Sequence, residues 1–138
     1  MNFITSIQTK LFTWKSIGRP VFMSKLHKVF LKKQYLKLIE SGKKTVEGRV
    51  GKEKFRLISQ GDTIEFISSD DKQTSLMCIV TRVAQYHSFR QMLEKEGVNN
   101  CLPGTLTIEE GISIYHQFPN YKDGAQKYGV CAFKLKKL

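Results

Sequence analysis

The feature that most constrains the fold is a cluster of four charged side chains between Gly42 and Arg49. Lys43 and Lys44 come directly after a helical pattern ends, and Glu47 and Arg49 follow within five residues. A buried charge costs several kcal/mol unless it is paired, so these side chains cannot simply fill a hydrophobic core. They must pair with one another or face a ligand. The cluster therefore predicts a charged cleft where a helix gives way to a strand.

The composition is that of an ordinary globular domain. The chain has 138 residues, of which 41% are hydrophobic and 25% charged, which favours one domain whose core needs no disulfide or metal. No apolar run approaches the ~20 residues that span a bilayer, so we expect no membrane segment. The three cysteines and three histidines are scattered, and no phosphate loop or dinucleotide fingerprint occurs. We therefore expect no metal and no cofactor.

The positive charge is concentrated in one part of the chain. The net charge is +11, and residues 25–56 carry eleven lysines and arginines against three acids. Residues 57–138 carry nine of each sign. Segregated positive charge predicts an anionic partner such as nucleic acid. The alternative is that these lysines lie on an exposed face and serve solubility alone.

The pattern of apolar residues after Met23 predicts an α+β domain. Strands are expected over 27–31, 45–50, 63–67, 74–86 and 128–135, and helices over 33–41, 89–96 and 108–118. Gly42 suits the left-handed position after the first helix, and Ser88 and Thr107 suit the N-caps of the other two. Five short strands with two or three helices favour a small β-barrel decorated by helices.

Residues 1–22 differ from the rest of the chain, because they contain no acid and their apolar residues recur at roughly helical spacing. The pattern is typical of an organelle-targeting segment, or of an upstream extension if Met23 opens the domain. We therefore predict an N-terminal extension, residues 1–22, that adds nothing essential, and a single domain, residues 23–138. Unpaired cysteines fit a reducing compartment, so we expect a cytoplasmic protein, or a mitochondrial one if residues 1–22 are a targeting segment.

Within the charged cluster, strand geometry places Glu47 and Arg49 on one face, where a charge-assisted pair is feasible. Such a pair either plugs one end of a barrel or orients Arg49 toward a phosphate or a base edge. Lysines just after a helix are also favoured by the helix dipole, which would explain Lys43 and Lys44 without a ligand. Lys44, Thr45 and Glu47 offer a potential base, nucleophile and acid, so an enzyme is an open alternative.

The run Gly42-x-Lys44-x-x-Glu47-x-Arg49 resembles the GxKxxExR signature of the ASCH domain family, named for homology to activating signal cointegrator-1. Blocks at 60–66, 83–93, 102–104 and 128–130 extend the resemblance over about residues 24–138. It implies a PUA-like β-barrel with a cleft beside the signature and a role in RNA binding. Under this resemblance Lys44, Glu47 and Arg49 line a basic cleft for RNA or a modified nucleoside, with Lys43 and Thr45 as secondary contacts.

One bacterial branch of the family looks like small amidohydrolases that deacetylate N4-acetylcytidine with a lysine, a threonine and a glutamate. By position Lys44 matches the lysine, but Glu47 stands where the threonine would be. Glu94 and Glu96 are nearby candidates for the remote glutamate. If the chain is an amidohydrolase, we expect Lys44 and Glu47 to be catalytic. A third alternative is a module whose basic face meets an acidic protein; in each case we expect a monomer.

Overall fold

The computed structural model describes residues 18–138, and within them the α+β class predicted from the sequence is confirmed. The elements in chain order are η1 (Val21–Met23), β1 (Leu26–Leu31), α2 (Lys33–Glu40), β2 (Val46–Val50), α3 (Glu53–Arg56), β3 (Thr63–Ser68), β4 (Ser75–Tyr86), α4 (Phe89–Glu96), α5 (Val98–Cys101), α6 (Ile108–His116), α7 (Tyr121–Tyr128) and β5 (Val130–Lys137). The described part thus holds six α-helices, two of only four residues, where two or three helices were expected.

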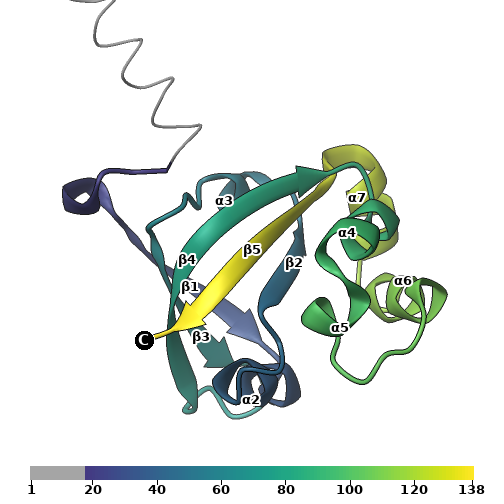
Figure 1. Cartoon of the computed structure of the whole chain (residues 1–138), viewed down its shortest axis with the longest axis horizontal. Helices are drawn as coiled ribbons and strands as arrows, with labels where there is room; N and C mark the ends of the chain where they lie inside the picture. The colour runs from purple at the N-terminus through teal and green to yellow at the C-terminus, as the bar shows by residue number, and fades with distance from the viewer. Residues whose placement is uncertain (1–17) are drawn as a thin grey trace, which may run out of the picture.

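The five strands form one curled sheet, a half-barrel, in the order β1-β3-β4-β5-β2 (Figure 1). β1 and β3 are parallel, and the other neighbours are antiparallel. β4 pairs with β3 through its first residues and with β5 through its later ones, with a register shift between Val80 and Arg82. A bulge of this kind bends a strand and increases its twist. One long strand therefore contributes to both halves of the curl and leaves β1 and β2 as the two edges.

Two hydrophobic clusters hold the helices to the sheet. The first lies between the sheet and α2 and includes Leu36, Phe66 and Phe133. The second lies between β2 and the helices α4, α6 and α7, and it includes Phe89 and Met92. The helices α4 to α7 gather beside β2 at one side of the molecule (Figure 1). The partly buried Tyr35 packs against both clusters, which places the charged cluster of β2 at their boundary.

Local signals in the sequence predicted several element ends correctly. Gly42 has a φ of +81°, and the hydroxyls of Ser88 and Thr107 accept hydrogen bonds from the N–H groups of Gln91 and Glu110.

The helix α7 was not predicted, since its central Gly124 disfavours a helix. Tertiary packing explains that glycine. A Cβ atom there would lie 3.0 Å from a Val50 methyl carbon, so the helix approaches β2 closely only because the position has no side chain.

The predicted extension, residues 1–22, lies mostly outside the described residues, and its role stays a prediction. Arg19, near its end, forms an ion pair with Asp62 and donates to the carbonyl oxygen of Leu57 at 2.8 Å. The Asp62 side chain is fully buried and also contacts the His27 ring nitrogen at 2.8 Å. Burial raises the pKa of Asp62, but hydrogen bonds from the Ser59 N–H, His27 and Arg19 outweigh it and leave that pKa below its ordinary value.

No helix among residues 18–138 has the length and apolar character needed to cross a membrane.

Candidate functional site

The signature segment turns sharply between α2 and β2 and carries Lys44 into the interior. After Gly42, the N–H of Lys44 donates to the Leu38 carbonyl at 3.0 Å, which holds the turn against the end of α2. Only 2% of Lys44 is exposed, whereas Lys43 lies in solvent. The turn therefore separates the two lysines, and of the pair it brings Lys44 alone to the predicted cleft.

The Lys44 ammonium group has a complete set of partners. Nζ donates to the carbonyl oxygens of Val46 at 2.7 Å and Cys101 at 2.6 Å, and it lies 3.1 Å from Oε1 of Glu47. An ammonium group has three donors, so these three acceptors use them all. It also lies 5.8 Å from the centroid of the Tyr35 ring. Through its bonds to the Cys101 and Val46 carbonyls, Lys44 connects α5 to β2.

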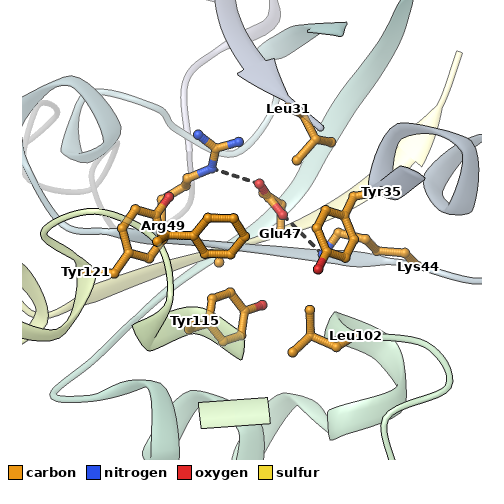
Figure 2. Close-up of a pocket in the computed structure, with 10 residues that line it drawn as sticks. Leu31, Tyr35, Lys44, Glu47, Arg49, Leu102, Tyr115 and Tyr121 are labelled. Carbon is orange, nitrogen blue, oxygen red and sulfur yellow. Dashed lines mark hydrogen bonds and ion pairs between the residues drawn. The ribbon is translucent and has the colours of Figure 1, made fainter. Parts of the chain in front are cut away.

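Glu47 stands between two cations, as the dashed lines of Figure 2 show. Oε1 faces Lys44, and Oε2 accepts a hydrogen bond from Nε of Arg49 at 2.7 Å. Burial raises the pKa of this carboxyl group, but the charges of Lys44 and Arg49 outweigh burial and hold the pKa below its ordinary value. Glu47 is therefore ionised, and the predicted charge-assisted pair between Glu47 and Arg49 is present.

Arg49 is the third member of the network. Its Nη2 donates to the carbonyl oxygen of Phe30 at 2.7 Å, and its Cζ lies 5.4 Å from the centroid of the Phe55 ring. Burial lowers the pKa of Arg49, but the Glu47 carboxylate raises it more, so the pKa lies above its ordinary value. The network of Lys44, Glu47 and Arg49 thus carries one net positive charge.

The three charged residues line a single pocket (Figure 2), which lies between β2 and the helices α2, α6 and α7. Four aromatic rings form most of its other walls, namely those of Tyr35, Tyr115, Phe118 and Tyr121, and Leu31, Gly48 and Leu102 complete it. Its volume is about 40 Å³. A water molecule needs at least ~10–15 Å³ by the same measure, so the pocket holds about three waters and not a whole base.

Tyr115 supplies a polar group that the sequence did not reveal. Its side chain is 3% exposed, and its hydroxyl has no hydrogen-bond partner among the described residues. The ring stacks on Phe89 with centroids 4.4 Å apart, which fixes its orientation. Burial raises the pKa of Tyr115 well above its ordinary value, so the hydroxyl is neutral. An unsatisfied buried group costs about 1–3 kcal/mol, so a ligand atom or a water that bonds this hydroxyl gains that much.

Gly48 is a second residue whose role needed the tertiary structure. A Cβ atom at this position would lie 2.6 Å from Sδ of Met92 and 3.3 Å from the Tyr115 hydroxyl. The missing side chain lets α4 and α6 pack directly on β2 beside Glu47 and Arg49. In the sequence Gly48 lies inside the signature, but only contacts from distant helices explain why it has to be small.

The remaining predicted residues lie away from the pocket. Thr45 is half-buried and does not line it; its backbone instead bonds with Asn100 and Leu135. Glu94 is exposed, and Glu96 is buried but pairs with Arg82, with 2.9 Å between Oε2 and Nη1. Neither glutamate lines the pocket, so neither has a place beside Lys44. No group of histidines, cysteines and acids among the described residues is arranged to hold a metal ion.

Comparison with known proteins gives one family model and several similar solved structures. The model of the ASCH domain matches residues 29–138. The chain is 40% identical to the solved hypothetical protein PH0355, with a TM-score of 0.73 over 83% of this chain and 99% of that one. It is 41% identical to protein PF0455 from Pyrococcus furiosus, with a TM-score of 0.66 over 82% and 97% of the two chains. An ASCH protein from Zymomonas mobilis shares the fold at 17% identity, with a TM-score of 0.57 over 80% of this chain and 66% of that one. No curated protein matches the chain.

Proposed function

The chain belongs to the ASCH domain family, and from that premise we propose that it binds RNA or a modified nucleoside at the pocket beside Lys44, Glu47 and Arg49. ASCH domains are associated with RNA binding in general, and the proposal assigns that role to a specific place. The observation that carries it is the Tyr115 hydroxyl, which is buried, faces this pocket and lacks a partner among the described residues.

The chemistry of the walls suits a nucleobase. Aromatic rings stack on bases regardless of sequence, and a tyrosine hydroxyl both donates and accepts hydrogen bonds. Arg49 holds a fixed positive charge in the wall. At the rim, the exposed Lys32 places its Nζ 5.4 Å from the centroid of the Phe118 ring, where it would meet a phosphate. The positive charge of residues 25–56 thus accompanies an aromatic pocket, a combination found in single-strand binders.

The small volume limits what enters. A pocket of about 40 Å³ admits one functional group of a base, such as a carbonyl or an acylated amino group, while the ring stays at the rim. Phe118 and Tyr121 are only partly buried, so an outward turn of these rings would enlarge the opening. We therefore propose that the pocket recognises a group on one nucleotide and that most of the strand lies on the basic surface outside it.

The test is the variant Tyr115→Phe, which removes the unpartnered hydroxyl and nothing else. We expect its affinity for cytidine, N4-acetylcytidine or a short single-stranded RNA to fall about five- to 150-fold, which corresponds to the ~1–3 kcal/mol gained when the buried hydroxyl finds a partner. Its free energy of unfolding should stay unchanged or rise, because no intramolecular bond is lost. Equal affinities of variant and unmodified chain would overturn the proposal.

Thr74→Val is the control for that experiment. The Thr74 hydroxyl donates to Oδ2 of Asp71 and lines neither this pocket nor the larger hollow described below, so its removal should lower the free energy of unfolding and leave nucleoside affinity unchanged. Each of the two variants removes one hydroxyl, and they should show opposite patterns. A change of affinity in both would point to a general loss of structure and not to the pocket.

The alternative hypothesis, an amidohydrolase with Lys44 and Glu47 as catalytic residues, receives no support from the contacts. Both groups are engaged, since Lys44 has used its three donors and Glu47 pairs with two cations. We expect little or no acetate release from N4-acetylcytidine. Robust turnover by the purified chain, abolished by Lys44→Ala with the fold intact, would establish the enzyme. A protein partner and the monomeric state stay predictions.

A further inference from the structure

A second and larger hollow lies at the other end of α7. It is formed by α3, the end of β4, the C-terminal half of α7 and the start of β5, and its volume is about 510 Å³. Sites for small ligands usually measure ~300–1,000 Å³, whereas the pocket beside Glu47 measures about 40 Å³. The two hollows share no lining residue. We call the second one the β4–α7 groove, defined by Arg56, Gln85, His87, Gln126, Lys127 and Tyr128.

The β4–α7 groove is positively charged. Arg56 and Lys127 line it, and no aspartate or glutamate is among the described residues of its wall. Cys131, at its floor, adds no negative charge, because burial raises the pKa of its thiol more than the neighbouring Arg56 lowers it. A hollow of this size with only cations among its ionised groups favours an anionic ligand.

Arg56 is held in place by the backbone. Its Nε donates to the carbonyl oxygen of Gly51 at 2.6 Å, and its Nη2 donates to that of Tyr128 at 2.6 Å. These bonds connect α3 to the end of α7 and fix the guanidinium charge in the groove wall. A charge that is already positioned loses little entropy when it meets a phosphate.

An aromatic ring stands beside the cations. Two lysines flank Tyr128, with Nζ of Lys127 at 5.3 Å and Nζ of Lys52 at 5.9 Å from the ring centroid. Stacked rings interleaved with cations are how proteins hold single-stranded nucleic acid. Gln85 and Gln126 add amide groups, which can donate to and accept from a base edge. The groove therefore offers separate groups for a phosphate, a ring face and a base edge.

We propose that the β4–α7 groove binds a nucleotide, with its phosphate at Arg56 and Lys127 and its base against Tyr128. The nucleotide would be a further unit of the RNA strand held at the pocket beside Glu47, so the inference rests on the proposed function. The helix α7 connects the two places, because Tyr121 lines the pocket and Tyr128 lines the groove. Eight helical residues span ~10 Å, a distance that a strand crosses in a few nucleotides.

The test compares two charge reversals on the full chain. Lys127→Glu changes the groove, and Lys136→Glu makes the same change near the far end of β5, where the lysine is exposed. For a short single-stranded RNA, we expect Lys127→Glu to lower the affinity about tenfold and to reduce the salt slope by about one. Lys136→Glu should bind like the unmodified chain. Tyr128→Leu should weaken binding, whereas Tyr128→Phe keeps the ring and should not.

Titration with AMP, followed by amide chemical shifts, tests the groove without a strand. We expect shifts at residues 85–87 and 126–129. If the unmodified chain binds neither RNA nor cytidine nor N4-acetylcytidine, the proposed function fails, and these shifts alone then support the groove. If RNA binds and Tyr115→Phe weakens it, but Lys127→Glu matches Lys136→Glu, the groove is overturned while the proposed function stands. The absence of AMP shifts at both segments would also overturn the groove.

Discussion

The Nη2 atom of Arg49 donates a hydrogen bond to the carbonyl oxygen of Phe30 at 2.7 Å, between the two edge strands of the sheet. Phe30 lies on β1 and Arg49 on β2, and these strands are not neighbours in the strand order. The side chain therefore spans the open seam of the half-barrel while its Nε binds Glu47. One residue of the family signature is thus both a wall of the pocket and a brace of the fold.

Substitution of Arg49 should destabilise the protein even without a ligand. Arg49→Ala leaves the buried Glu47 with Lys44 as its one cationic partner and should lower the free energy of unfolding by about 3 kcal/mol. Arg49→Lys keeps the charge but loses the planar fork, so we expect about half that loss. Urea unfolding curves measure both. If Arg49→Ala unfolds at the urea concentration of the unmodified chain, the bond across the seam contributes no stability.

The network of Glu47 should make stability depend on acid pH. The pKa of Glu47 lies below its ordinary value of 4.5 in the folded protein, so the unfolded chain takes up this proton first as pH falls. The contribution is complete above about pH 4.5 and is lost as pH falls toward the folded-state pKa. Glu47→Gln lacks this group. Its deficit in unfolding free energy should be largest near neutral pH and shrink below pH 4.5. If the deficit stays constant with pH, the loss of stability in Glu47→Gln comes from the altered side-chain packing and not from the lost charge.

A side chain at position 48 should disturb the packing of α4 on β2. In Gly48→Ala the new methyl would meet Sδ of Met92 at 2.6 Å and its Cε at 2.7 Å, so the helix or the thioether must move. Overpacking of this kind costs about 1–3 kcal/mol. The double variant Gly48→Ala/Met92→Ala should lose less stability than the sum of the two single losses. Additive losses would show that Met92 is not the obstacle.

RNA binding should weaken steeply with salt. The positive charge of residues 25–56 would displace counterions from the phosphates, and the affinity then falls as salt rises from about 50 to 200 mM. Cytidine carries no phosphate and serves as the control, whose affinity should change little over the same range. Flat RNA affinity would indicate that the strand makes no phosphate contacts and that the site receives a neutral small molecule.

Two truncated chains can locate the start of the domain, which we predicted at Met23. A chain that begins at Gly18 keeps the contact between Arg19 and the buried Asp62, whereas one that begins at Met23 lacks it. If residues 1–22 are dispensable, both chains unfold within about 5 °C of the full chain, the shift expected for ~1 kcal/mol in a domain of this size. A larger drop in the Met23 chain alone would move the boundary back to Arg19.

Much of this protein follows from its sequence because local rules determine it. The turn at Gly42, the caps at Ser88 and Thr107 and the pairing of Glu47 with Arg49 involve residues a few positions apart, where backbone geometry leaves few alternatives. The α+β class also follows, since the alternation of apolar residues has the period of each element. The sequence also predicted that Lys44, Glu47 and Arg49 line one pocket, because all three lie within six residues at the start of one strand.

Tertiary structure decided what these residues face. The hydroxyl of Tyr115 meets Gly48 only because α6 packs on β2, and in the sequence that tyrosine is one more apolar position of a helix. The sequence around Lys44 would suit an exposed turn equally well. In the fold its Nζ donates to the Cys101 carbonyl, which α5 contributes, and the side chain is buried. Contacts between distant segments depend on how whole elements pack, and local pattern carries little information about them. The sequence therefore determined the charged cluster, and packing determined the partners of each of its members.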